Sequence, residues 1–274
     1  MPELPELRIS SDFINKNSRH RFIKAWHVEK ENNPKPFEWE HKFNVNAESN
    51  GKELLLNFYN RVGDELKIWV FMGMSGNWKY VSTDEWNQTK FVRMRLDDES
   101  GNSLLLYGGF MGPKYSVGKP FTGTKRGPDP TKQFDKFKSN VLDNLDKKVF
   151  DNPICEVLLN QEYFSGIGNY LRSTIIYYAD VNPFESSRNI IKQNEKVLDL
   201  CREVPLRSYQ LNGGQLRDWQ SPFGQDSTQF KEWVYYQKGL SCKDKGGRTF
   251  WFEEKWKDSC PYKINQKKSG KSKV

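Results

Sequence analysis

The spacing of hydrophobic residues changes near the middle of this chain, and the change predicts two regions of different structure. Between residues 21 and 107 apolar residues occur in short, partly alternating runs, which is the pattern of half-buried β-strands. Clusters of glycine, asparagine and aspartate separate the runs and predict turns. Short strands at this spacing are typical of a β-sandwich. Five strands are expected, at residues 21–28, 52–58, 66–72, 91–96 and 103–107.

Helical spacing is found on both sides of this strand-rich region. Residues 4–14 carry their apolar side chains on one face and predict a short amphipathic helix. Residues 133–145 repeat that pattern. Asn152-Pro153 predicts the start of another helix, with asparagine as the cap and proline in the first turn. A further helix is expected after the glycine-containing turn 165–169.

The C-terminal part of the chain predicts a loop, a hairpin and a tail. Residues 211–226 are rich in glycine and polar residues and are expected to form a long loop. The aromatic runs 233–236 and 249–252 predict two strands around a tip at 245–248. The last residues, 256–274, are rich in lysine and are expected to form a disordered basic tail.

Together these patterns place the protein in the α+β class, with two domains. The N-terminal helix and β-sandwich occupy residues 1–120, and a linker rich in glycine, proline, lysine and threonine occupies 121–132. The helical domain with its hairpin follows at 133–255, before the tail at 256–274.

Charge and cysteine content narrow the classes of partner. The chain of 274 residues has a formal charge of +8, which indicates a polyanionic partner, nucleic acid before anionic membrane. A basic enzyme without such a partner is the alternative. No apolar run is long enough to span a membrane or to form the core of a signal peptide. Four cysteines without C-x-x-C spacing predict reduced thiols in the nucleus or cytoplasm, not a zinc ribbon or a secreted disulfide scaffold: Cys155, Cys201, Cys242 and Cys260.

The first residues carry the clearest candidate chemistry. Removal of Met1 would expose Pro2 as a secondary amine, whose α-amino group titrates near pH ~8 and is partly neutral at physiological pH. Amines of this kind attack carbonyl carbons and form Schiff bases. Glu3 places a carboxyl group beside the amine, where it could move protons. The alternative is a loosely ordered chain end without function.

The turn at Ser165–Asn169 is a second candidate site. Its glycines allow a close approach of the backbone to a ligand, and amide groups at the start of the following helix favour a phosphate. Asn169 would add a side-chain donor. An ordinary turn of a helical hairpin is the alternative.

Several of these segments resemble the formamidopyrimidine-DNA glycosylase/endonuclease VIII family. Two further segments are similar to its vertebrate endonuclease VIII-like type-1 branch and to viral relatives of that branch. The similar segments are dispersed over about residues 1–255, in the order in which the family has them. They are Pro2–Leu7, Asn50–Leu54, Gly73–Gly76 and Ile167–Leu171 for the family, and Phe150–Glu156 and Gly247–Phe252 for the branch.

The resemblance implies a β-sandwich, a helix–two-turn–helix domain and a zincless-finger β-hairpin that together bind DNA. It implies that the damaged nucleotide is flipped out of the duplex, the base is excised and the strand is nicked, without metal or other cofactor. It also implies roles for individual residues. These are Pro2 as nucleophile, Glu3 as proton shuttle, Lys52 as a catalytic-site lysine on phosphate, Glu6 in lesion recognition, Met74 in the gap left by the flipped base, and Asn169 and Arg248 on phosphate.

The sequence departs from the family pattern at two places. Most members carry four zinc-binding cysteines in the finger, whereas this region holds Cys242 and Cys260 alone. An Arg-Arg-Phe-Gly segment that supplies further gap-filling side chains is replaced by Gly108–Lys114. Phe110 and Met111 are the candidates to fill the gap in its place, and weak discrimination of the opposite base would follow.

The sequence therefore predicts a bifunctional DNA glycosylase/lyase for oxidised pyrimidines and for ring-opened or hydantoin lesions. An enzyme that prefers 8-oxoguanine and a noncatalytic DNA-binding protein on the same fold are the alternatives. The expected partner is double-stranded DNA with oxidised bases or abasic sites, with single-stranded or bubble DNA as further candidates. The protein is expected to act as a monomer, away from membranes.

Overall fold

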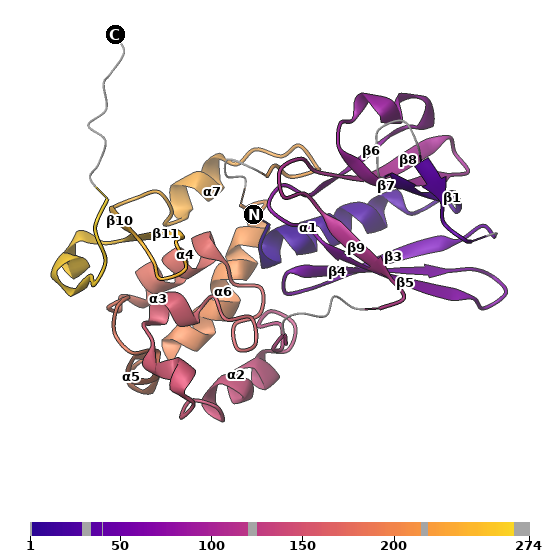
Figure 1. Ribbon diagram of the computed structural model, residues 1–274. Helices are drawn as coiled ribbons and strands as arrows, with labels where there is room; N and C mark the ends of the chain where they lie inside the picture. The colour runs from indigo at the N-terminus through magenta and orange to yellow at the C-terminus, as the bar shows by residue number, and fades with distance from the viewer. Residues whose placement is uncertain (1, 29–33, 40, 120–124, 215–218, 266–274) are drawn as a thin grey trace, which may run out of the picture. The chain divides into compact units, whose positions relative to one another are not determined.

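The computed structural model describes residues 2–28, 34–39, 41–119, 125–214 and 219–265 (Figure 1). These residues form two compact units. The first comprises Met1–Lys125 and Arg207–Glu232, and the second comprises Arg126–Leu206 and Trp233–Val274. The chain thus leaves the first unit, builds most of the second, and returns to the first before it completes the second.

Two antiparallel sheets form the body of the first unit. One has the strand order β2-β1-β7-β8-β6 and the other has the order β3-β4-β5-β9. Apolar side chains from both sheets, among them Phe22, Leu56 and Leu106, are buried in one shared core. The strands are β1 (Phe22–Val28), β2 (Pro34–Pro36), β3 (Asn44–Asn50), β4 (Glu53–Tyr59), β5 (Glu65–Phe71), β6 (Asn77–Ser82), β7 (Val92–Asp98), β8 (Asn102–Tyr107) and β9 (Lys114–Val117).

Helix α1 (Leu4–Asn17) packs on strand β3 and adds Leu7, Phe13 and Ile14 to the core. The Ser11 hydroxyl donates to the Ala47 carbonyl at 2.7 Å, and the Asn15 side chain exchanges two hydrogen bonds with the backbone of the same residue. A helix tied to a strand in this way gives the N-terminus a fixed place on the sandwich.

The second unit is helical. Its helix α4 is largely buried, and strand β11 of a two-stranded hairpin packs against it. The elements are α2 (Phe134–Leu142), α3 (Ile154–Val157), α4 (Asn169–Ala179), α5 (Ser187–Gln193), most of α6 (Lys196–Gln210), β10 (Leu240–Lys243) and β11 (Thr249–Phe252). Helix α7 (Thr228–Trp233) and the end of α6 belong to the segment at which the chain passes between the units. Short 3₁₀ turns lie at Thr83–Gln88, Lys148–Asp151 and Glu254–Ser259.

The predicted α+β class is confirmed, and the five predicted strands are all present as β1, β4, β5, β7 and β8. The prediction of a strand at 233–236 is wrong. Strand β11 pairs instead with β10 (Leu240–Lys243). The last pair is Lys243 with Thr249, so residues 244–248 form the turn. The aromatic side chains of 233–236 stack on other rings: Tyr235 lies on Tyr177 with ring centres 4.3 Å apart.

The observed units also differ from the predicted domain limits. Residues 207–232 belong to the sandwich unit and not to the helical one, because their side chains contact helix α1. Tyr209 donates to Asp12 at 2.7 Å, and the Phe223 ring packs edge-on against Phe13. Residues 126–132 of the predicted linker belong to the second unit. Of the predicted tail, residues 256–265 are ordered in part by a 3₁₀ turn and a bridge to Cys242, and the remainder lies outside the described residues.

Among the described helices, none combines the length and the apolar character that a membrane span requires.

Candidate catalytic turn and nucleic-acid interface

The N-terminal turn is held by a reciprocal cap. Glu3 is the cap residue of α1, and its backbone N–H donates to the Glu6 carboxylate at 2.7 Å while its own carboxylate accepts from the backbone N–H of Glu6. A cap of this kind satisfies two amide groups that a helix start otherwise leaves unpaired. Pro2 and both glutamates are buried, with Glu3 2% and Glu6 1% exposed. The predicted nucleophile and its neighbouring acid therefore sit on a fixed backbone.

Glu6 also attaches the predicted lesion loop to this turn. Its second carboxylate oxygen accepts from the Gly214 amide at 2.5 Å. The neighbouring Gly213 has φ +74°, and a Cβ there would lie 2.8 Å from Ile9 and 2.9 Å from the Glu6 carboxylate. Both the left-handed backbone and the lack of space for a Cβ require glycine at position 213. Residues 215–218 of the loop lie outside the described residues. The predicted contact of Glu6 with the lesion stays a prediction, and its bond to the loop is a role that the sequence did not indicate.

Lys52 lies in the tight turn between β3 and β4, beside Gly51 with φ +55°. It is 8% exposed, so the structure does not leave its side chain free in solvent. Lysine is rarely buried unless its charge is compensated. The roles expected of Lys52, a phosphate contact or a proton acceptor, stay predictions.

Met74 and the predicted gap-filling residues lie on two loops that are bonded together. The Met74 amide donates to the Met111 carbonyl at 2.8 Å, and the Ser75 hydroxyl donates to the Phe110 carbonyl at 3.0 Å. Gly73 permits this approach, because a Cβ on it would lie 2.2 Å from the Met111 oxygen. The structure thus brings Met74 close to Phe110 and Met111, which are distant from it in the sequence.

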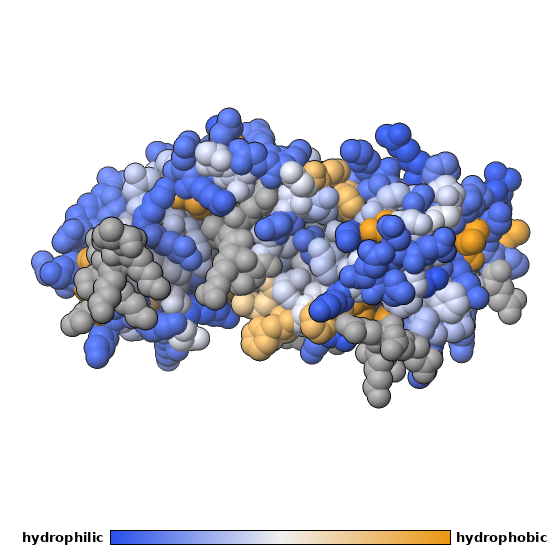
Figure 2. All heavy atoms as spheres, turned by 90° about the horizontal axis from the view of Figure 1, so that it is seen from above, coloured by the Kyte–Doolittle hydropathy of each residue, from blue (hydrophilic) through white to orange (hydrophobic). Residues whose placement is uncertain are grey.

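An exposed apolar crest, here defined as Phe91, Phe110 and Met111, is formed by the Met111 loop and by the turn that precedes β7. Phe110 is 80% exposed, Met111 65% and Phe91 52%. Phe91 and Met111 have left-handed backbones with φ of 59° and 44°, which bulky side chains adopt at a cost of about 1–3 kcal/mol. Most of the face in Figure 2 is hydrophilic, and its hydrophobic patches are small. The gap-filling role expected of Phe110 and Met111 stays a prediction.

A hollow of about 420 Å³ lies beside these loops, within the first unit. The hollow lies between the residues that follow Met74 and the end of the predicted lesion loop. These two segments are bonded, since the Asn77 side chain donates to the Gln220 carbonyl at 2.9 Å. Its lining is polar and aromatic: Ser75, Asn77, Trp78, Lys79, Tyr107, Trp219, Gln220, Ser221, Pro222 and Gly224. Burial raises the pKa of the Tyr107 hydroxyl, so this group stays a hydrogen-bond donor at neutral pH.

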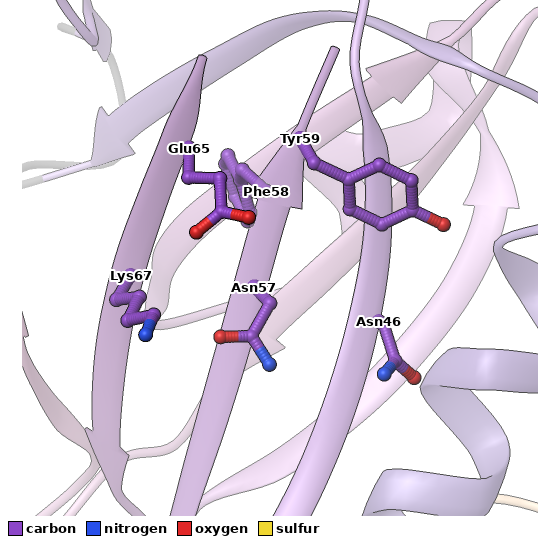
Figure 3. Close-up of a pocket in the computed structure, with 6 residues that line it drawn as sticks. All are labelled: Asn46, Asn57, Phe58, Tyr59, Glu65 and Lys67. Carbon is purple, nitrogen blue, oxygen red and sulfur yellow. The ribbon is translucent and has the colours of Figure 1, made fainter. Parts of the chain in front are cut away.

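A second hollow, of about 280 Å³, lies on the face of strands β3, β4 and β5 (Figure 3). Asn46, Asn57 and Lys67 reach it from three neighbouring strands, and Glu65 lies on the same strand as Lys67. It contains no residue that the sequence assigned to the site.

In the second unit, Asn169 is the first residue of α4 and follows a braced glycine turn. The Gln161 side chain donates to the Ile167 carbonyl at 2.9 Å and accepts from the Gly166 amide at 3.0 Å. The Asn169 amide group donates to the Thr249 carbonyl of the hairpin at 2.8 Å. An amide NH₂ has two N–H groups, so the second remains available for a ligand at this helix start.

The hairpin tip is a compact turn between Asp244 and Arg248. The Asp244 carboxylate accepts from the Arg248 amide at 2.8 Å, and the Asp244 amide donates to the Arg248 carbonyl at 3.0 Å. Gly247 has φ +75°, the left-handed conformation that such a turn requires. The Arg248 side chain is exposed, while Asp244 is 6% exposed.

Arg172 joins the tip to the helix start. It is completely buried, and its guanidinium pairs with Asp244 at 2.8 Å, donates to the Asn169 side-chain oxygen at 2.6 Å and donates to the Cys155 carbonyl at 2.7 Å. Asn169 and Arg248 are thereby connected through two residues that sequence reasoning missed. The signal was present in part, because Arg172 follows Asn169 by three positions and so shares its helical face.

The cysteines of the finger do not form a metal site in the described part of the chain, where no group of three His, Cys, Asp or Glu side chains could hold an ion. Burial raises the pKa of the Cys155 thiol to about 12, and burial beside Cys260 raises the pKa of Cys242.

Comparison with known proteins shows similarity over most of the chain. The formamidopyrimidine-DNA glycosylase N-terminal domain family matches residues 1–108. The chain is 32% identical to human Endonuclease 8-like 1, over 92% of this chain and 72% of that protein. It is 27% identical to formamidopyrimidine-DNA glycosylase of Ureaplasma parvum serovar 3, over 83% of this chain and 85% of that protein.

Two solved structures share the fold. The MutM (Fpg) protein of Thermus thermophilus has a TM-score of 0.71 at 20% identity, and covers 92% of this chain and 97% of its own. A mutant Fpg of Lactococcus lactis in complex with DNA that contains Fapy-dG also has a TM-score of 0.71, at 18% identity with the same coverage.

Proposed function

Because the chain belongs to the formamidopyrimidine-DNA glycosylase/endonuclease VIII family of DNA glycosylases with AP lyase activity, we propose that it excises oxidised bases and nicks the strand. Its substrates are oxidised pyrimidines and ring-opened or hydantoin lesions in duplex DNA. The observation that carries the proposal is the capped turn, in which Pro2 and Glu3 are buried and adjacent at the start of α1.

The reaction uses the Pro2 amine that is exposed once Met1 is removed. The amine forms a bond to the sugar C1′ as the bond from C1′ to the damaged base breaks, and Glu3 moves the protons that this exchange requires. The C1′–O4′ bond then breaks, the sugar ring opens with a proton going to O4′, and the secondary amine is left as a positively charged iminium, which acidifies the C2′ proton. Loss of that proton expels the 3′ phosphate, and a second elimination expels the 5′ phosphate. The steps balance without a metal or another cofactor.

Lys52, Asn169 and Arg248 supply contacts to the DNA backbone. The buried position of Lys52, the second N–H of Asn169 at a helix start and the exposed guanidinium of Arg248 each suit a phosphate oxygen. Phosphate contacts position the duplex and carry no sequence information, so lesion choice comes from elsewhere. We assign it to Glu6 and the loop at 211–226.

The gap left by the flipped nucleotide is filled by Met74 together with the crest residues Phe110 and Met111. Apolar side chains that insert between bases are an established device for kinking or opening a duplex. Phe110 and Met111 are the most exposed members of the crest, and their loop is bonded to that of Met74. Apolar contacts do not read the hydrogen-bonding groups of the orphaned base, so we expect weak discrimination of the opposite base.

Borohydride trapping tests the proposal. With protein whose Met1 has been removed and an oligonucleotide that carries an oxidised pyrimidine, reduction of the iminium should leave a covalent adduct at Pro2, located by mass spectrometry of the N-terminal peptide. Protein with an uncleaved N-terminal extension is the matched control and should give no adduct. An adduct on an internal lysine, or full activity of the extended protein, would overturn the role of Pro2.

A panel of lesion oligonucleotides, in duplex, bubble and single-stranded form, ranks the substrates. Faster excision of 8-oxoguanine than of every pyrimidine lesion would favour the alternative specificity. Binding without excision of any lesion would favour a noncatalytic protein on this fold. The enzyme is expected to act as a monomer, in the nucleus or cytoplasm wherever the DNA lies.

A further inference from the structure

An acidic residue lies at the root of a finger tip that is otherwise basic. Lys243, Lys245 and Arg248 surround Asp244 in the sequence, and all three are exposed, whereas Asp244 is buried. A carboxylate near a DNA-binding surface weakens attraction to phosphate, and burial of a charge is costly. The buried Asp244 carboxylate must therefore be compensated by other interactions of the finger.

The hydrogen bonds of Asp244 supply that compensation. One carboxylate oxygen accepts from the Arg248 amide at 2.8 Å, and the other pairs with Arg172 at 2.8 Å. The backbone of the same residue closes the turn, since its carbonyl accepts from the Gly247 amide at 2.9 Å and its N–H donates to Arg248 at 3.0 Å. Two of these bonds end on Arg248 itself.

Arg172 connects Asp244 to Asn169 at the start of helix α4. Its guanidinium lies 5.0 Å from the centre of the Phe250 ring and donates to the Asn169 oxygen at 2.6 Å, while the amide group of Asn169 donates to the Thr249 carbonyl. The buried pair thus stands between the two phosphate-binding candidates of this unit.

We propose that Asp244 is a positioning residue for DNA binding, which presets the backbone of Arg248 with Arg172 as its buried counter-ion. The inference rests on the proposed function, because it takes Arg248 to contact phosphate. A tip that is fixed before binding loses less conformational freedom when DNA arrives, so affinity rises although the carboxylate itself repels phosphate.

The direction in which DNA affinity changes in Asp244→Ala distinguishes a positioning role from a purely electrostatic one. Asp244→Ala removes one negative charge from a chain of formal charge +8, and charge alone predicts tighter binding. The positioning role predicts weaker binding, by up to about tenfold, the loss expected for one charge-assisted hydrogen bond. It also predicts that the slope of log affinity against log salt falls in magnitude by about one, as for loss of a phosphate contact.

Asp97→Ala is the matched control. Asp97 is a buried acid of the first unit that pairs with Arg95 at 2.6 Å, so its loss changes charge and burial in the same way away from the finger. Affinities are measured by fluorescence anisotropy on a duplex with a reduced abasic site, over a series of salt concentrations. We expect weaker binding for Asp244→Ala only, with an unchanged single-turnover rate at saturating DNA.

A double-mutant cycle with Arg248→Ala decides the mechanism. If Asp244 acts through Arg248, Asp244→Ala has no further effect on affinity in the Arg248→Ala background. Additive losses, or binding of Asp244→Ala as tight as wild type, would overturn the inference. If Arg248→Ala alone binds normally at every salt concentration, the phosphate role of Arg248 is wrong and the inference fails with it.

A second variant covers the case in which Asp244→Ala does not fold because Arg172 is left without its partner. Arg172→Met with Asp244→Ala removes both charges of this buried pair and keeps the net charge of the chain. It should fold and still bind DNA more weakly than wild type. Wild-type affinity for this folded variant would contradict the positioning role.

Discussion

The N-terminal turn of the first unit and the finger of the second both use a buried carboxylate to fix the backbone. In the turn, Glu6 accepts from the Glu3 amide beside Pro2. In the finger, Asp244 accepts from the Arg248 amide. The two differ in what else the carboxylate holds: Glu6 reaches a backbone amide of the lesion loop, whereas Asp244 pairs with the full charge of Arg172.

This difference indicates how each region tolerates change. Backbone amides and a helix start stabilise a carboxylate without any side chain that a mutation could remove. A buried ion pair depends on both partners, and loss of one leaves an uncompensated charge. The turn should therefore be sensitive mainly at Glu3 and Glu6 themselves, while the finger should also be sensitive at the residue that balances its acid.

The largest effect is expected from a change at Glu3 that removes proton transfer but keeps the helix cap. Glu3→Gln keeps an oxygen that can accept from the Glu6 amide but cannot exchange protons as a carboxylate does. Excision of an oxidised base should fall by about 10²–10⁴, the usual contribution of a positioned acid–base group, while some cleavage at preformed abasic sites remains. Single-turnover kinetics on both substrates measure this, with exposed Glu38→Gln as control. Equal losses on both substrates would mean that Glu3 does more than transfer protons.

The second prediction tests whether the turn depends on both bonds of Glu6. Glutamine offers one oxygen and one NH₂, so in Glu6→Gln either Glu3 or Gly214 is left with an unpaired amide. A buried unsatisfied donor costs about 1–3 kcal/mol, which should lower the free energy of unfolding measured by denaturant titration. Glu48→Gln, on an exposed position of β3, should change stability little. Equal stability of both variants would contradict a structural role of Glu6.

The third prediction concerns the finger alone. Arg248→Ala should weaken binding of damaged and undamaged duplex together and reduce the magnitude of the salt slope by about one. Lesion preference should not change, because a phosphate contact carries no base information. Exposed Arg19→Ala, in the other unit, serves as the charge-matched control. Loss of activity on a single lesion type would show instead that Arg248 reads the damaged base.

The smallest effect is expected from chelators. If the buried Arg172–Asp244 pair holds the finger in place of a metal, treatment with a chelator should leave the melting temperature and DNA affinity unchanged. Elemental analysis provides the direct check. One zinc per chain would mean that the finger is held as in the zinc-containing members of the family.

Sequence reasoning was most successful where periodicity or a local motif was involved. The strands β4, β5, β7 and β8 and the helix α1 have clear apolar faces, and the Gly-x-Gly-Asn turn marked the start of α4. Strand β3 was missed because its sequence, with Asn44, Asn46 and Asn50, has low strand propensity and is paired by the sheet around it. The aromatic run 233–236 was misassigned because rings that stack on a helix resemble rings that alternate along a strand.

The parts of the site that depend on distant contacts could not be predicted. The Glu6–Gly214 bond joins residues 208 positions apart, and the bond between the Met74 and Met111 loops joins two turns on different strands. Phe91 has a left-handed backbone in the structure, and no local sequence pattern indicates this conformation for a phenylalanine. The pairing of Arg172 with Asp244 likewise required the packing of β11 on α4.

The return of residues 207–232 to the first unit has a consequence for synthesis on the ribosome. Protein chains emerge from the N-terminus, and domains generally fold in that order. Here the sandwich can form early, but Gly214, Tyr209 and Phe223 reach α1 only after most of the second unit has been made. During synthesis the N-terminal turn is therefore present long before the loop that Glu6 binds, and the first unit is completed only after Glu232 has been added.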